Sequence, residues 1–282
     1  MCRLFGFRSI LESQVHSSLV SAENALMEQS NEHPDGWGVA YYISRSPHIL
    51  RSVQTAVNDT LFQRVSGVVQ SHTVLAHLRK ATVGSLNILN THPFQFGRWV
   101  FAHNGNIKNF ENDRQRLLDL INEEYRKFIL GTTDSEILFF LFLSFLGKPK
   151  EIHEAMDSDK IVDAVVQVVK AVENITGPCR EDADGPNTET YLTFLISNGE
   201  SMLGLQAGKP LYFSTHKKSC PDRGSCKFFG KYCESPHSDD PVNHLIFSSE
   251  PLQGENVWIP LQHKEIICID RSMKIQKSRI NY

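Results

Sequence analysis

The sequence lacks a hydrophobic run long enough to cross a membrane, and it lacks a strong net charge of either sign. The longest apolar segment, residues 137–146, is about half as long as a membrane-spanning helix. The net charge of −3 over 282 residues favours neither nucleic acid nor an anionic membrane as a partner. We therefore expect a globular chain in which this segment is a buried helix, or a helix that faces another copy in a homo-oligomer.

Cysteine is scarce, and the start of the chain has no secretory leader pattern. The six cysteines, at positions 2, 179, 220, 226, 233 and 268, do not form the paired framework of a disulfide-rich secreted domain. Arg3 and Arg8 interrupt the only early apolar stretch, so the hydrophobic centre of a signal peptide is missing. These absences predict a reduced, cytoplasmic setting.

Strand patterns lie towards both ends of the chain, and helical patterns dominate the middle. This order is typical of an α+β protein, and we predict a single domain over residues 2–282. Two polar stretches, about 179–189 and 215–243, are expected to be surface insertions. The expected strands include 4–7, 36–43, 72–78, 99–105, a hairpin from 190, 211–214, 244–249 and 265–270; the expected helices are 17–30, 111–129, one from about 134, and 161–175.

The chain opens with Met1-Cys2, an unusual position for a cysteine. A small second residue normally allows Met1 to be removed, which would leave Cys2 with both a thiol and a free α-amine. A nucleophile and a base a few ångströms apart can form a complete catalytic unit. Taken alone, an early cysteine is better explained as a small apolar residue.

Five short motifs give Cys2 a context. In this order they resemble the class II glutamine amidotransferases, whose glutaminase domain has an N-terminal nucleophile (Ntn), and in particular the short stand-alone YafJ-type members. That group also resembles the γ-glutamyl hydrolase of ergothioneine synthesis and the amidotransferase subunit of yeast glutathione breakdown. The resemblance implies a four-layer αββα sandwich of two antiparallel sheets. The motifs are CRLFGF (2–7), HPDGWG (33–38), HLRKATVG (77–84), NTHPF and HNGNIKN (90–94 and 103–109), and TTDSE (132–136).

The resemblance implies a reaction at a γ-glutamyl amide. Cys2 would attack the amide carbon and form a γ-glutamyl thioester, and its own α-amine would carry the proton. The negative oxygen of the intermediate needs fixed donors, which would be the side chain of Asn104 and the backbone N–H of Gly105.

The resemblance also assigns the residues that bind the amino-acid head of the substrate. Arg79 would bind the carboxylate with its planar guanidinium, and Thr82 would add a hydrogen bond. Asp134 would bind the ammonium group. Taken alone, Asp134 could instead be only the N-cap of the following helix. Three nearby histidines are expected to be structural hydrogen-bonding residues, because the α-amine already supplies the base: His77, His92 and His103.

Several functions remain open at this point. Glutamine is the default substrate, with ammonia released or passed to a partner protein, since no second domain is expected to use it. A γ-glutamyl peptide, such as a glutathione-like or thiohistidine conjugate, is the alternative substrate. An inactive binding or scaffold protein is a further alternative, which the presence of all the motif residues disfavours. Lys80 stands where the sugar-phosphate synthases have tryptophan, which argues against an ammonia gate there.

A second cluster of reactive residues lies in the predicted insertion 215–243. Its spacing suits a structural zinc site, with Cys220, Cys226, Cys233 and His237 as candidate ligands. The alternative is a surface loop with unpaired thiols. A nucleic-acid role is disfavoured because the chain lacks a strongly basic surface. We expect this insertion to shape the rim of the active site, and the proposed reaction itself needs no cofactor.

Overall fold

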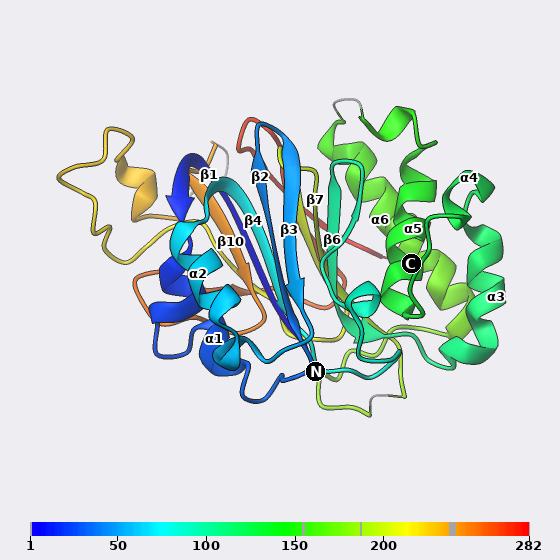
Figure 1. Ribbon diagram of the computed structural model, residues 1–282. Coiled ribbons are helices and arrows are strands. Elements are labelled where there is room, and N and C mark those ends of the chain that lie inside the picture. Colours follow the sequence, from blue (N-terminus) through cyan, green and yellow to red (C-terminus); the bar gives the residue numbers. More distant parts are fainter. Residues whose placement is uncertain (1, 154–155, 187, 237–240, 282) are drawn as a thin grey trace.

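The computed structural model describes residues 2–153, 156–186, 188–236 and 241–281. Two antiparallel sheets pack face to face, and helices cover the outer face of each sheet (Figure 1). The predicted four-layer αββα architecture is therefore confirmed.

The first sheet has seven strands in the order β11-β9-β10-β1-β4-β2-β3. Its central strand, β1, pairs antiparallel with β10 on one side and with β4 on the other. The register with β4 places Arg3 opposite Leu78, so the start of β1 lies beside the end of β4. The bounds are β1 Arg3–Gln14, β2 Trp37–Ile43, β3 Ser46–Ser52, β4 Gln70–Leu78, β9 Tyr212–Ser214, β10 His244–Ser248 and β11 Ile259–Pro260.

The second sheet has six strands in the order β13-β12-β8-β7-β6-β5. The hairpin predicted from residue 190 is confirmed as β7 and β8. Strand β6 ends in the HNGN segment and pairs with β7. The bounds are β5 Phe94–Phe96, β6 Trp99–Asn106, β7 Tyr191–Ser197, β8 Met202–Gln206, β12 Glu265–Ile269 and β13 Ile275–Arg279.

Three buried clusters of apolar side chains hold the four layers together. One lies between the sheets and includes Leu4, Leu75 and Ala102. Another lies under the helices of the first sheet, and the third lies under those of the second sheet. The helices are α1 Leu26–Gln29, α2 Thr60–Val68, α3 Phe110–Leu120, α4 Glu123–Arg126, α5 Asp134–Leu146 and α6 Ser158–Thr176; short 3-10 turns occupy Ala56–Asn58, Ile88–Asn90, Glu151–His153 and Lys231–Cys233.

The longest apolar run forms α5, which lies inside the chain. Its residues from Asp134 to Leu143 are all buried, so this helix has no free apolar face to offer a second copy. Of the two alternatives for this segment, the buried helix is correct. Within the described ranges, no helix is both long and apolar enough to span a bilayer.

Two predicted helices are shorter than expected. The segment 17–30 forms a π-helical turn at Ser17–Ser21 and the short α1 instead of one helix. The segment 111–129 breaks at Ile121, whose backbone is extended, and Asn122 caps the new helix α4 with its side chain. The side-chain cap of Asn122 therefore competes locally with continuation of the helix.

Candidate active site

Cys2 lies immediately before β1, beside the end of β4 in the first sheet. Its Sγ accepts a hydrogen bond from the Lys80 N–H at 3.4 Å and lies 3.5 Å from the Lys80 carbonyl oxygen. Burial raises the pKa of the Cys2 thiol, so the resting group is a neutral thiol and not a preformed thiolate. A nucleophilic attack by Cys2 therefore needs a base to take its proton.

One small cavity collects most of the predicted site residues. Cys2, Arg79, Thr82, Gly105 and Asp134 all line it, although they come from separate segments of the chain. The same cavity is also lined by Lys80, Ala81, Val83, His92, His103, Thr133 and Ser135. The motifs identified in the sequence thus converge on one place.

Asn104 is buried in β6, next to Gly105. Successive residues of a strand point to opposite faces, and Ala102 belongs to the cluster between the sheets. Asn104 therefore faces the space between the sheets, as does Cys2, which lies two residues before the inward-facing Leu4. The Asn104 Oδ1 atom is buried and has no hydrogen-bond partner among the described residues.

Arg79 is buried, and its guanidinium is bound to the loop that follows it. It donates to the carbonyl oxygens of Val83 and Ser85 at 3.2 Å and to that of Gly84 at 3.4 Å. Asp35, from the HPDGWG motif, accepts the Ala81 N–H at 2.8 Å and so fixes the start of this loop. Asp35 was not among the residues predicted to form the site.

Asp134 is not the N-cap of α5. Thr133 is the cap, and its side chain accepts the Glu136 N–H. The Asp134 carboxylate accepts the N–H of Ile107 at 2.7 Å and that of Ser135 at 2.8 Å, which ties the end of β6 to the start of α5. Burial raises the pKa of this carboxyl, and a bound ammonium group would compensate its charge.

Asn90 connects the Arg79 loop to the Asp134 motif, a role that sequence reasoning missed. Its Nδ2 donates to the Ser85 carbonyl oxygen at 3.0 Å and to Thr132 Oγ1 at 3.1 Å. Its Oδ1 accepts the Thr132 N–H at 2.9 Å. The only sequence signal was its place at the start of the NTHPF motif.

The three histidines of the site differ in their hydrogen bonding. His103 is bonded at both ring nitrogens, through Nδ1 to Ser135 Oγ and through Nε2 to the Tyr191 carbonyl oxygen, each at 2.9 Å. His77 is bonded at Nε2, to the His103 carbonyl oxygen at 3.2 Å. His92 has no partner at either nitrogen within the described part of the chain. The structural role expected for these residues fits His103 best and His92 least.

The cavity is small in this structure. Its free volume of about 20 Å³ has room for one water molecule but not for a γ-glutamyl group. Residues 84–89, which continue the Arg79 loop, are exposed. The Arg79 loop therefore runs from the wall of the cavity, at Val83, out to the surface.

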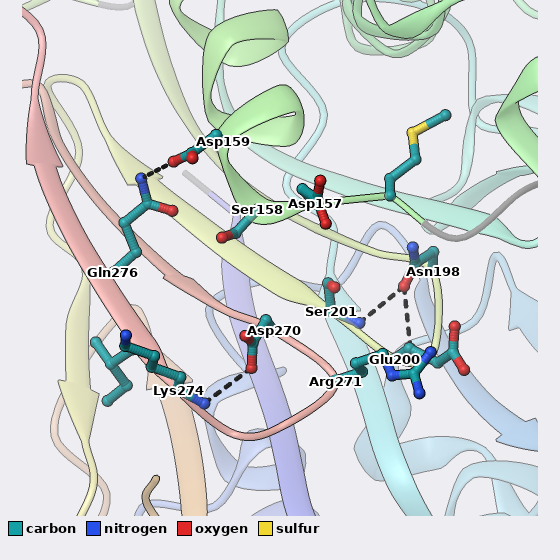
Figure 2. Close-up of a pocket in the computed structure, with 12 residues that line it drawn as sticks. Asp157, Ser158, Asp159, Asn198, Glu200, Ser201, Asp270, Arg271, Lys274 and Gln276 are labelled. Atoms are coloured by element: carbon teal, nitrogen blue, oxygen red, sulfur yellow. Dashed lines mark hydrogen bonds between the residues drawn. The ribbon is translucent and has the colours of Figure 1, made fainter. Parts of the chain in front are cut away.

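Larger pockets lie elsewhere and contain none of the predicted catalytic residues. One of about 510 Å³ lies between the start of α6 and the turns β7–β8 and β12–β13 (Figure 2). Two hydrogen bonds within it involve its polar side chains: Gln276 donates to Asp159, and Asp270 accepts the backbone N–H of Lys274. Size alone is therefore a poor guide to the reactive site here.

The cysteine-rich insertion does not shape the rim of the active site. Cys220, Cys226 and Cys233 line a different pocket, against Phe7–Val15 of the chain. In Figure 1 this yellow-to-orange segment projects at the end of β1 opposite the N-terminus. The expectation was wrong because the length of β1 separates the two ends of the sheet.

The zinc hypothesis for this insertion stays a prediction. Its fourth candidate ligand, His237, lies outside the described residues, as does Met1. Across the ranges that are described, no group of three or more His, Cys, Asp or Glu side chains is arranged to hold a metal ion. The described residues of the second predicted insertion, 179–186 and 188–189, form no helix or strand and are mostly exposed, apart from the buried Cys179.

Comparisons with known proteins identify the family of this chain. The family described as class-II glutamine amidotransferases matches residues 1–213. A putative glutamine amidotransferase of Haemophilus influenzae is 33% identical over 258 residues, which cover 86% of this chain and 76% of that protein. A probable glutamine amidotransferase of Saccharomyces cerevisiae is 28% identical over 72% of this chain, and the match spans 62% of its own length.

Solved structures show the same fold. A glutamine aminotransferase class-II domain protein from Silicibacter pomeroyi matches with a TM-score of 0.63 at 21% identity, covering 99% of this chain and 98% of that one. The amidotransferase acting on glutamine and phosphoribosylpyrophosphate from Bacillus subtilis matches with a TM-score of 0.61, over 49% of its length. Together with the family match over residues 1–213, this establishes that the chain belongs to the class II glutamine amidotransferases.

Proposed function

We propose that this chain cleaves the γ-glutamyl amide bond of a small substrate, with Cys2 as the nucleophile. The observation that carries the proposal is the single cavity shared by Cys2, Arg79, Gly105 and Asp134. These residues supply a thiol, a cation for a carboxylate, a backbone donor for an oxyanion and an anion for an ammonium group. That is the full set that a γ-glutamyl hydrolase needs.

The reaction begins from a neutral thiol. Once Met1 is removed, the free α-amine of Cys2 takes the thiol proton while Sγ attacks the amide carbon. The side chain of Asn104 and the N–H of Gly105 stabilise the oxyanion, and one such donor is worth roughly 3 kcal/mol of barrier. The proton passes to the leaving amine as the C–N bond breaks. Water then hydrolyses the thioester and releases glutamate.

The head of the substrate is bound by opposite charges. Arg79 binds the α-carboxylate, Thr82 adds a hydrogen bond to it, and Asp134 binds the α-ammonium group. Because the resting Arg79 donates to its own loop, binding exchanges those carbonyl partners for a charged carboxylate. Charged acceptors form stronger hydrogen bonds than neutral ones, which favours the exchange.

Two substrate classes share this head. Glutamine would release ammonia to solvent or to a partner protein. A γ-glutamyl peptide is the alternative, and a γ-glutamyl-hercynylcysteine sulfoxide hydrolase of Mycobacterium tuberculosis supports it, since it is 42% identical over 72 residues that cover 25% of this chain. All six cysteines are free thiols, which supports a reducing compartment such as the cytoplasm.

The test is covalent labelling followed by kinetics. Intact protein is incubated with 6-diazo-5-oxo-norleucine, a glutamine mimic that alkylates such nucleophiles, and its mass is measured. We expect a protein that lacks Met1 and carries one adduct, mapped to Cys2. Cys2→Ala should lose both the adduct and turnover, whereas Cys226→Ala, which removes a thiol outside the site, should keep both.

Glutamine and glutathione are then compared as substrates of the wild-type protein. Turnover that survives in Cys2→Ala would refute the mechanism. A protein that retains Met1, takes no adduct and turns over neither substrate would support the binding or scaffold alternative instead.

A further inference from the structure

His92 lies in a rigid part of the site. Its ring packs against the His77 ring with centroids 4.1 Å apart, and against the Phe94 ring at 4.7 Å. Its backbone carbonyl lies so close to Gly38 that a Cβ there would come within 2.0 Å of the oxygen. The residue before it, Thr91, is bonded to Arg51 through its carbonyl oxygen at 3.0 Å. The orientation of the imidazole is therefore set by packing.

The ring nitrogens of His92 stand out because nothing in the described chain satisfies them. Both Nδ1 and Nε2 are buried without a hydrogen-bond partner, although the residue is only 4% exposed. Buried polar atoms are rarely left unpaired, since each one loses its hydration without compensation. His103 is hydrogen-bonded at both ring nitrogens, whereas His92 lines the Cys2 cavity with both of its ring nitrogens unbonded.

The protonation state of His92 limits what it can do. Burial, reinforced by the neighbouring His77, His103 and two arginines, lowers the pKa of His92 well below 6.5. The ring is therefore neutral at pH 7, with one nitrogen that donates and one that accepts. A neutral imidazole suits a ligand that itself carries both donors and acceptors, as an amino acid amide does.

We propose that His92 is a substrate-binding residue of this site, whose two ring nitrogens gain their hydrogen bonds only when a γ-glutamyl group fills the cavity. This inference rests on the proposed function and names a residue that contacts its substrate. It also explains why the ligand-free fold tolerates two unpaired nitrogens here. The bound substrate supplies the partners that the protein lacks.

The experiment compares two substitutions, one that keeps the ring and one that keeps the hydrogen-bonding groups. His92→Phe keeps a planar ring but removes both nitrogens, and His92→Gln keeps one donor and one acceptor. The melting temperature of the ligand-free protein, its shift on addition of glutamate, and the kcat and KM for the better substrate are measured for each. His244→Phe is the matched control, because His244 also has a buried Nε2 without a partner but lines the pocket at the other end of β1.

We expect His92→Phe to melt at the wild-type temperature or above it, because an apolar ring replaces unsatisfied polar atoms. Its kcat/KM should fall about tenfold or more, and the stabilisation by glutamate should shrink. His92→Gln should recover most of both losses, and His244→Phe should keep wild-type kinetics.

Two results would overturn this inference and leave the proposed function intact. One is wild-type kcat/KM in His92→Phe. The other is a large drop in the melting temperature of ligand-free His92→Phe, with an activity loss that His92→Gln does not restore, because that pattern indicates a purely structural residue. If the wild-type protein shows neither turnover nor an adduct at Cys2, the proposed function fails and this inference fails with it.

Discussion

Gly105 is important both for the proposed active site and for the packing of β6 against β7. A Cβ built there would lie 2.0 Å from the Tyr191 carbonyl oxygen and 2.5 Å from His103 Nε2. Both contacts are much shorter than van der Waals distance, and the first involves backbone. Gly105→Ala therefore has to push β6 away from β7, next to the N–H that we assign to the oxyanion.

The cost follows from two effects. Overpacking a well-packed interior costs about 1–3 kcal/mol. Displacing Tyr191 also weakens its bond with His103, a neutral hydrogen bond worth roughly 1 kcal/mol. Together these give about 2–4 kcal/mol, which for a chain of this size lowers the melting temperature by roughly 5–15 °C.

The assay is thermal unfolding followed by circular dichroism, with γ-glutamyl hydrolysis measured at a temperature where the variant is still folded. The matched control is Gly67→Ala, on the exposed side of α2, where a Cβ would meet nothing within 4 Å. The control should be neutral or stabilising by up to about 1 kcal/mol. If Gly105→Ala melts within a degree of wild type and remains fully active, the close packing and the oxyanion role of Gly105 are both refuted.

Two further predictions concern buried titratable groups. Asp134→Asn should raise KM sharply, and it should also destabilise the fold by about 1–3 kcal/mol, because the new NH₂ group would face a backbone N–H that the carboxylate now accepts. Unchanged KM and melting temperature would contradict both the substrate-binding role and the structural role of Asp134. Burial lowers the pKa of His77 to about 3, so the folded protein holds this imidazole neutral. As the pH falls from 6.5 towards 3, the unfolded chain binds a proton that the folded protein does not, and the free energy of unfolding decreases. Between pH 7 and pH 4 this amounts to roughly 3 kcal/mol, and His77→Gln should flatten the pH dependence of urea unfolding by that amount; equal slopes would refute it.

Much of the site was predictable from sequence because its residues occur in short motifs with distinctive spacing. The motifs containing Cys2, Arg79 and Asp134 do lie around one cavity, with Gly105 between them. The spacing of Thr133 and Glu136 is typical of a capping box and predicted a helix start at about 134, and Thr133 is indeed the cap of α5, although Asp134 taken alone was also a good cap candidate. The role of Asn90 was also hidden, since it connects the nearby Ser85 to Thr132, which lies 42 residues further along the chain, and such a long-range contact leaves no local pattern.

The fold was predicted less evenly. Alternation and apolar runs predicted most of the strands but not β3, and the two-sheet arrangement came from the family resemblance. The helix expected over 111–129 breaks at Ile121, where Asn122 caps a new helix with its side chain. The place of the insertion 215–243 depends on which end of the 12-residue strand β1 it packs against. The local sequence does not show which end of β1 the insertion contacts. The zinc hypothesis for Cys220, Cys226 and Cys233 stays a prediction, because the position of the insertion does not test it.

The hydrogen bonds that Arg79 makes to its own loop affect how strongly a ligand can bind to its guanidinium. Because its guanidinium already donates to Val83, Gly84 and Ser85, a ligand gains affinity only by the difference between its own acceptor and these carbonyls. A neutral amide or ester in place of the α-carboxylate merely replaces one neutral acceptor with another, whereas a carboxylate adds a full charge. If Arg79 binds the substrate as we propose, the carbonyl groups of its own loop compete with that substrate, and the site favours ligands that carry a negative charge.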